Sequence, residues 1–201
     1  MPKLPRSFYL RDDVLKITRE LLGKFLVTRF NGVITAGMIT EAEAYEGEID
    51  SASHAFKGRR TPRTEVMFAN GGTAYVYICY GIHHLFNVIT NQSNIPHAIL
   101  IRGIEPAEGI ETMLKRRQMN SPAYNLTAGP GALAAAMGIY VKHTGLDLLG
   151  DTIWIEDRGV KIPSRKIRPT IRVGVEGSGK DARLLYRFII EGNPWVTRTP
   201  R

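Results

Sequence analysis

The chain is poor in cysteine and lacks any long apolar run. Its one cysteine, Cys79, cannot form an internal disulfide or a zinc site made of several thiolates. No stretch approaches the ~20 apolar residues that cross a bilayer, and residues 1–11 are too polar and too rich in proline for a secretory signal. We therefore expect a protein of a reducing compartment, the cytoplasm, with no membrane partner.

Several familiar enzyme signatures are absent. The sequence has no complete phosphate-binding P-loop, no Gly-x-Gly-x-x-Gly fingerprint and no His-x-Glu followed by Pro-Cys-x-x-Cys. Enzymes that depend on these motifs, including the zinc deaminases, are thereby excluded. No linker rich in Pro, Gly or Ser divides the chain, and 43% of its residues are hydrophobic. Residues 1–201 are predicted to form a single domain.

Acidic residues are the scarcer charged type, which leaves a formal net charge of +8. The excess is clustered in two runs: Lys57, Arg59, Arg60 and Arg63, and then Lys161, Arg165, Lys166, Arg168 and Arg172. Such clusters attract polyanions, although an ordinary solvated surface is the alternative. A protein that binds nucleic acid would be associated with the nucleoid.

Hydrophobic periodicity and turn signals predict an α+β fold with a mainly antiparallel, curved sheet and surrounding helices. We expect helices at residues 14–22, 106–117 and 132–137. Strands are expected at residues 24–29, 33–45, 97–103, 152–156, 170–175 and 184–190.

An aromatic hairpin is the most distinctive feature that is present. Tyr75, Tyr77 and Tyr80 lie within six residues, and Tyr80-Gly81 is flanked by β-branched and aromatic residues. Two strands meeting at Tyr80-Gly81 would form a protruding hairpin with Tyr80 at its tip, where the ring can enter a base stack as a wedge. The alternative is a sheet whose aromatic residues are simply core.

Two carboxylates precede this hairpin on the 33–45 strand. Glu41, Glu43 and Tyr45 would share one face, because side chains alternate along a strand. Like charges at this spacing repel unless they are solvated, paired or functional, so the alternative is an exposed edge strand. Residues 46–70 then have little periodicity and predict a long ordered loop of the kind that often carries function.

A carboxylate strand, an aromatic hairpin and a basic loop together suit the removal of a base from a nucleic acid. Such an enzyme must rotate the nucleotide out of the duplex, fill the gap and stack the extruded base on aromatic faces. A carboxylate beside the sugar can stabilise positive charge and take a proton from water. A catalytically silent nucleic-acid-binding module is the main alternative, and a polysaccharide hydrolase using Glu41 and Glu43 is a third.

The sequence resembles the alkyladenine (3-methyladenine) DNA glycosylase family of base-excision repair over almost the whole chain. The matching motifs are Thr40-Glu41-Ala42-Glu43-Ala44-Tyr45, Ser53-His54, Arg60-Thr61-Pro62-Arg63, Ala74-Tyr75-Val76-Tyr77 with Tyr80-Gly81 and Asn87, Leu100-Ile101-Arg102, Gly129-Pro130-Gly131, Arg172-Val173-Gly174-Val175 and Gly192-Asn193-Pro194-Trp195. The resemblance implies a single mixed domain whose antiparallel sheet resembles a small barrel.

The resemblance also implies a reaction and residue roles. The activity would be monofunctional excision of alkylated or deaminated purines (the 3-methyladenine, 7-methylguanine, hypoxanthine and ethenoadenine class) from duplex DNA by a monomer without a metal or other cofactor. Glu43 would activate water with help from Arg102, and Tyr80 would intercalate. Tyr45, His54, Tyr77 and Asn87 would bind the flipped base, and Arg60, Arg63 and Gly131 would contact the DNA backbone. Ala132 stands where the family commonly has lysine, so one phosphate contact should be weaker.

Overall fold

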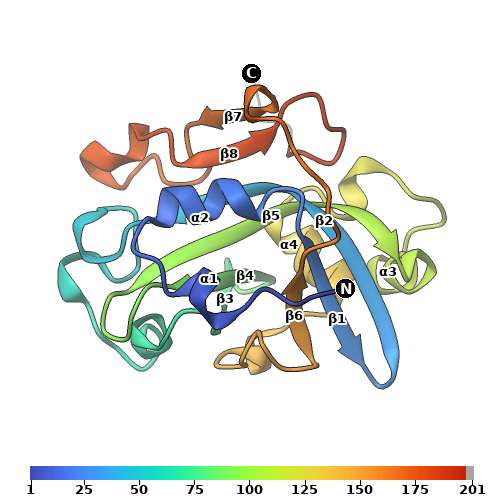
Figure 1. The fold of residues 1–201 in the computed structure, drawn as a ribbon, viewed down its shortest axis with the longest axis horizontal. Coiled ribbons are helices and arrows are strands. Elements are labelled where there is room, and N and C mark those ends of the chain that lie inside the picture. The colour runs from blue at the N-terminus through green and yellow to red at the C-terminus, as the bar shows by residue number, and fades with distance from the viewer. Residues whose placement is uncertain (198–201) are drawn as a thin grey trace.

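The sheet is antiparallel at every strand pair, in a computed structural model that describes residues 1–197. Its strands run in the order β3, β4, β5, β2, β1, β6, and β8 pairs with both β2 and β7. The bounds are β1 Phe25–Phe30, β2 Val33–Tyr45, β3 Ala74–Cys79, β4 His83–Thr90, β5 His97–Glu108, β6 Ile153–Glu156, β7 Ile167–Thr170 and β8 Arg187–Ile190. The sheet curves into a half-barrel, so the predicted α+β class with a barrel-like sheet is confirmed (Figure 1).

The helices cover the sheet on both sides (Figure 1). They are α1 (Arg6–Tyr9), α2 (Val14–Leu21), α3 (Ile110–Arg117) and α4 (Pro130–Met137). Asp13 caps α2 by accepting a hydrogen bond from the Lys16 amide at 2.8 Å, and Ile17 and Leu21 on its inner side are fully buried. In Figure 1, α2 crosses in front of β2 and β5 while α4 lies behind them, so the long strands are buried between layers.

β2 is a central strand, because it pairs with β5 on one side and with β1 and then β8 on the other. The alternative of solvated glutamates on an edge strand is therefore wrong. The pairing with β5 shifts register around Glu41, and the bend occurs where the partner changes from β1 to β8. The result is that Glu41 and Glu43 are both fully buried.

Two expected elements differ in the structure. The helix predicted from Pro106 begins only at Ile110, since β5 continues to Glu108 and Pro106 pairs with Gly37 at a register shift, where a missing N–H is tolerated. The strand predicted at residues 170–175 ends at Thr170. Beyond it the Val173 amide donates to a Glu43 carboxylate oxygen at 2.8 Å instead of to a neighbouring strand.

The predicted hairpin and loop are both present. β3 and β4 pair up to Cys79 and His83 and are joined by Tyr80, Gly81 and Ile82. Tyr80 and Gly81 have left-handed φ angles of 51° and 75°, and the Ile82 amide donates to the Cys79 carbonyl at 3.2 Å, which closes a tight turn. Residues 46–70 contain short 3₁₀ turns at Gly47–Ile49, Phe56–Gly58 and Glu65–Phe68. Within this loop, Met67 and Phe68 are buried in a small apolar cluster with Tyr75 and Ile89.

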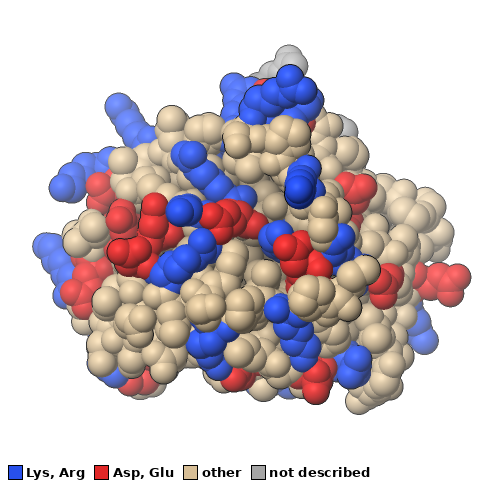
Figure 2. All heavy atoms as spheres, in the orientation of Figure 1, with Lys and Arg blue, Asp and Glu red and all other residues tan. Residues whose placement is uncertain are grey.

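Figure 2 shows acidic and basic side chains interspersed on the face viewed in Figure 1, so this face does not present an unbroken basic surface. Within residues 1–197, none of the helices combines the length and the apolar character that a membrane span requires.

Candidate active site

A cavity of about 920 Å³ opens between the aromatic hairpin, the 46–70 loop and the start of α4. Most of the residues that the sequence singles out lie on its wall: Tyr45, His54, Arg63, Tyr77, Tyr80, Asn87, Arg102 and Gly131. Glu43 and Arg60 do not line it. Segments distant in the sequence are therefore brought together around one space.

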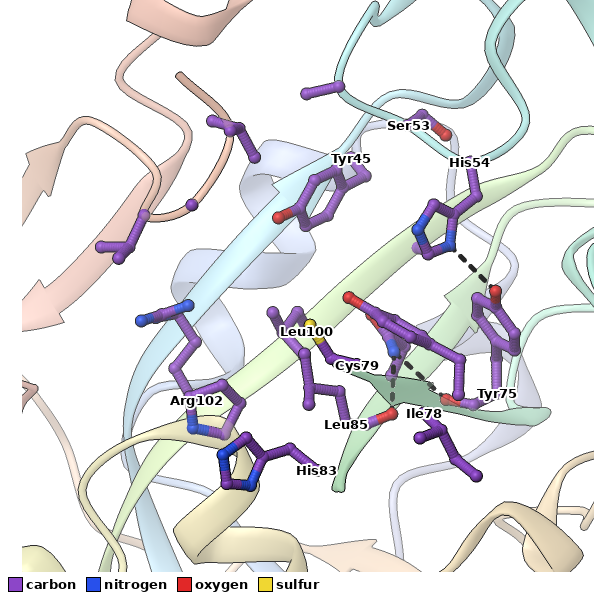
Figure 3. A pocket seen from close by; sticks show the side chains of 18 of the residues that line it. Tyr45, Ser53, His54, Tyr75, Ile78, Cys79, His83, Leu85, Leu100 and Arg102 are labelled. Atoms are coloured by element: carbon purple, nitrogen blue, oxygen red, sulfur yellow. Dashed lines mark hydrogen bonds between the residues drawn. The ribbon is translucent and has the colours of Figure 1, made fainter. Parts of the chain in front are cut away.

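Aromatic rings form two opposing sides of this cavity. Figure 3 shows Tyr45 across the cavity from His54, with Tyr75 beyond the histidine. The His54 and Tyr77 ring centroids are 4.6 Å apart in an edge-to-face arrangement, and those of Tyr75 and Tyr77 are 5.5 Å apart. Strand alternation thus places Tyr75 and Tyr77 together, and a flat molecule could stack between this cluster and Tyr45.

His54 is held in a neutral state. Its Nδ1 is 2.9 Å from the Tyr75 hydroxyl, an interaction drawn in Figure 3. Burial, together with the nearby guanidinium groups of Arg63 and Arg59, lowers the pKa of His54 from 6.5 to about 4. An uncharged imidazole at neutral pH can present a ring face to an aromatic ligand without the cost of burying a cation.

Glu43 lies immediately behind the cavity wall. Its Oε2 accepts a hydrogen bond from the Tyr45 hydroxyl at 2.9 Å, and its Oε1 accepts the Val173 amide at 2.8 Å and lies 3.4 Å from Arg102 Nε. Burial raises the pKa of Glu43, against the lowering effect of Arg102, Val173 and Tyr45. A carboxylate with a raised pKa is a better proton acceptor, and Oε2 keeps lone-pair capacity for one more donor.

Arg102 connects Glu43 to a second carboxylate. Its Nε lies 2.8 Å from Glu41 Oε1, and Arg187 Nε reaches the same oxygen at 2.7 Å. The Thr197 amide donates to Glu41 Oε2 at 2.6 Å. The charges of Glu41 and Glu43 thus balance those of Arg102 and Arg187. Glu41 also orients the Arg102 guanidinium, which faces Glu43. Although burial lowers it, Glu43 and Glu41 raise the pKa of Arg102, which stays cationic.

Asn87 is fixed at the cavity wall. Its Nδ2 donates to the backbone carbonyls of Tyr75 and Leu85, both at 3.2 Å, and the side chain is almost fully buried. These two bonds use both amide hydrogens, so the side chain cannot turn away easily when a ligand enters. Asn87 is thus a rigid steric element of the pocket.

The hairpin tip carries large apolar side chains in solvent. Tyr80 is 89% exposed and Ile82 is 72% exposed. The hairpin tip therefore presents apolar surface to solvent.

The expected backbone contacts occupy different environments. Arg60 forms a two-point ion pair with Glu65 at 2.8 and 2.7 Å, whereas the Arg63 guanidinium lies 5.1 Å from the Tyr77 ring centroid. Gly131 lies in the first turn of α4, where an added Cβ would lie 3.0 Å from the His83 ring, so a side chain there would require His83 to shift. Arg63 and Gly131 lie at the cavity, and Arg60 lies away from it.

Arg172 was counted in a basic run, but its side chain is fully buried and cannot belong to a surface patch. It pairs with Asp50 and lies behind Tyr45, and neither contact was predicted. The sequence around it gives no local signal of this burial, because its neighbour Ile171 is itself 51% exposed.

Within the described residues 1–197, no group of three or more His, Cys, Asp or Glu side chains is arranged to hold a metal ion. His83 and His84 are adjacent on β4 but diverge: His83 packs against Gly131, and His84 Nδ1 accepts the Val141 amide at 3.2 Å.

Comparison with known proteins identifies the family. Residues 7–194 match methylpurine-DNA glycosylase (MPG). A protein of Chlamydia felis is 43% identical over 188 residues, covering 93% of this chain and 95% of the relative. A protein of Clostridium acetobutylicum is 44% identical over 202 residues, covering 97% of each chain. One from Bacillus cereus is 42% identical over 202 residues, covering 96% of this chain and 98% of the relative.

All three relatives bear the provisional name 3-methyladenine DNA glycosylase. The family match spans nearly the full chain and includes the carboxylate strand, the aromatic hairpin and the α4 start. The chain therefore belongs to the methylpurine-DNA glycosylase family and is a DNA glycosylase, an enzyme that hydrolyses N-glycosyl bonds.

Proposed function

We propose that this glycosylase excises alkylated or deaminated purines from duplex DNA by flipping the damaged nucleotide into the aromatic cavity. Glu43 then activates the water that attacks the N-glycosidic bond. The observation that carries the proposal is the Glu43 environment, a buried carboxylate with a raised pKa next to a cavity walled by tyrosine rings. The products are the free base and an abasic site, and the DNA strand stays intact.

Glu43 has the two properties that a general base needs. Its raised pKa increases its affinity for the proton of water. The Val173 amide and Arg102 hold its orientation, while Arg102 can also hold the attacking water. Positive charge that develops on the sugar as the base departs would be stabilised by the ionised carboxylate.

Features of the cavity and the hairpin support base flipping. Stacking between Tyr45 and the cluster of His54 and Tyr77 would contribute roughly 1–3 kcal/mol for the flipped base, comparable to the few kcal/mol that extrusion costs. Tyr80, exposed at the hairpin tip, would fill the gap in the duplex. Arg63 and the first turn of α4 lie beside the cavity, where phosphates flanking the flipped nucleotide would pass.

The direct test is excision from duplex oligonucleotides that contain hypoxanthine, ethenoadenine or an alkylated purine. Strand breaks that appear only after hot alkali are expected, because the enzyme leaves abasic sites. Breaks without alkali would contradict water as the nucleophile. If no lesion is excised while lesion DNA still binds, the catalytically silent binding module is the better description.

Asn87 is expected to exclude guanine-type bases by occupying the space that an exocyclic amino group would need. Asn87→Ser shortens the side chain, so release of guanine relative to hypoxanthine should rise, by up to about tenfold for the relief of one steric contact. Leu85→Val, at another wall position, serves as the control for a general loosening of the pocket. An unchanged guanine-to-hypoxanthine ratio in Asn87→Ser would remove Asn87 from this role.

A further inference from the structure

Arg172 is a buried charge that the proposed reaction does not use. Its Nη1 donates to the Ala44 carbonyl at 2.9 Å and to Asp50, and its Nη2 donates to Asp50 at 2.8 Å and to the Asp181 carbonyl at 3.1 Å. The Nε of Arg172 is buried without a hydrogen-bond partner among the described residues. The bonds to Asp50, Ala44 and Asp181 thus fix the plane of the guanidinium, although its Nε has no partner in the described part of the chain.

Two aromatic rings also stack on this guanidinium. The Arg172 Cζ lies 4.7 Å from the Tyr45 ring centroid and 5.2 Å from that of Tyr186, so both rings pack on the guanidinium. Tyr45 lines the cavity and Arg172 does not, which places the guanidinium behind the ring as seen from the cavity. The plane of a guanidinium covers an aromatic face in a way that a lysine ammonium cannot.

Through Asp50, the Arg172 guanidinium is also connected to the chain segment that leads to His54. Asp50 also accepts the amides of Glu46 at 3.2 Å and Ala52 at 3.0 Å, and so shapes the chain that leads into His54. The Tyr45 hydroxyl, at the far end of the stacked ring, contacts Glu43. Any tilt of the Tyr45 ring would therefore change the width of the stacking slot and the hydrogen bond to Glu43 together.

We propose that Arg172 is a positioning residue that fixes the Tyr45 ring as the rigid wall of the base-binding slot and holds the Tyr45 hydroxyl on Glu43. The inference rests on the proposed function, since Tyr45 is the surface on which the flipped base stacks. Because the Tyr45 ring is already ordered before the base binds, little conformational entropy is lost on binding.

A double-mutant cycle between Arg172→Lys and Tyr45→Leu tests the inference. Lysine keeps a positive charge beside Asp50 but loses the flat stacking face. With Tyr45 present, Arg172→Lys should lower the single-turnover excision rate about five- to tenfold and weaken the fluorescence change of ethenoadenine on binding. In the Tyr45→Leu background the same substitution should change the rate less than about twofold. Equal losses in both backgrounds would overturn the inference.

Arg6→Lys is the control for replacing an arginine that forms an ion pair away from the cavity. Arg6 also bonds a carboxylate and a backbone carbonyl, Asp147 at 2.6 Å and Gly71 at 2.8 Å, and it does not line the cavity. A purely structural loss lowers the unfolding temperature and the fraction of active enzyme. The rate constant per active molecule should fall for Arg172→Lys and stay unchanged for Arg6→Lys; a fall of equal size in both would count against the inference.

Asp50→Asn provides a second variant if Arg172→Lys does not fold. It keeps a hydrogen-bond acceptor for Arg172 but removes the countercharge, and its effect on excision should also vanish in the Tyr45→Leu background. Failure of the proposed function is separately visible: the wild-type enzyme would then excise no lesion, or Glu43→Gln would excise as well as wild type. If the wild-type enzyme excises lesions normally but the losses caused by Arg172→Lys and Tyr45→Leu are additive, the Arg172 inference is rejected and the proposed function stands.

Discussion

At the residue scale, the Tyr45 hydroxyl is expected to set the pH at which Glu43 becomes active. Its hydrogen bond lowers the pKa of Glu43, which burial raises. Tyr45→Phe removes the bond and keeps the ring, so the pKa of Glu43 should rise and the acidic limb of the pH–rate profile should move to higher pH. Single-turnover rates between pH 5 and 9 measure this limb.

Tyr186→Phe is the control for Tyr45→Phe. The Tyr186 hydroxyl donates to Glu46 at 2.7 Å and has no contact with Glu43, while its ring packs on Arg172 as Tyr45 does. The acidic limb should stay in place in this variant. A limb that does not move in Tyr45→Phe, or moves equally in both variants, would contradict the role of the Tyr45 hydroxyl.

Protonation of His54 should lower the free energy of unfolding at acidic pH, but it should not set the acidic limb of the pH–rate profile. Its pKa of about 4 in the folded protein lies below the 6.5 of an unperturbed histidine, so the unfolded chain binds the proton first as pH falls. The free energy of unfolding should therefore decline between pH 6.5 and 4, and His54→Gln should remove that part of the decline. Denaturant unfolding at pH 7 and pH 5 measures this decline. An identical decline in the wild-type protein and in His54→Gln would refute the lowered pKa of His54.

At the scale of elements, the β3–β4 hairpin is a rigid support for an exposed side chain. Tyr80→Ala should slow excision about tenfold or more and reduce the flipped fraction, because nothing then fills the gap left by the base. Stability should stay nearly constant, since Tyr80 is 89% exposed. Ethenoadenine fluorescence on binding reports the flipped fraction.

Val33→Ala, an exposed residue beside the turn of the β1–β2 hairpin, is the matched control for Tyr80→Ala. It should leave excision and the fluorescence signal unchanged. Tyr80→Ala with normal fluorescence would show that flipping does not depend on the hairpin tip.

Elements with strong local signals were predictable from the sequence. The 33–45 strand and the turn at Tyr80-Gly81 follow from alternation and from residues that favour turns, and both are present. Elements whose bounds depend on partners distant in the sequence were not predictable. β5 extends past Pro106 because β2 lies beside it, and residues 171–175 leave the sheet because Arg172 and Val173 bond Asp50 and Glu43.

At the scale of the whole molecule, the site depends on contacts between distant parts of the chain. The Arg172–Asp50 pair spans 122 residues, and the Val173–Glu43 bond spans 130. Residue spacing carries no signal for such pairs. The sequence therefore pointed to Glu43, Arg102 and the tyrosines, but not to the contacts that Asp50, Arg172 and the Val173 amide make with each other and with Glu43. It also pointed to a basic protein, and the net charge of +8 should make DNA binding weaken as salt rises.

The measurement that tests the central claim is excision and binding by Glu43→Gln. Glu105→Gln is the control, because Glu105 bonds Asn193 and not a residue of the cavity wall, as Glu43 does. Loss of the general base should lower single-turnover excision by about 10²–10⁴-fold. Binding to lesion DNA should persist with the wild-type salt dependence, because the phosphate contacts are untouched. Undiminished excision by Glu43→Gln would contradict the assignment of Glu43 as the residue that activates water.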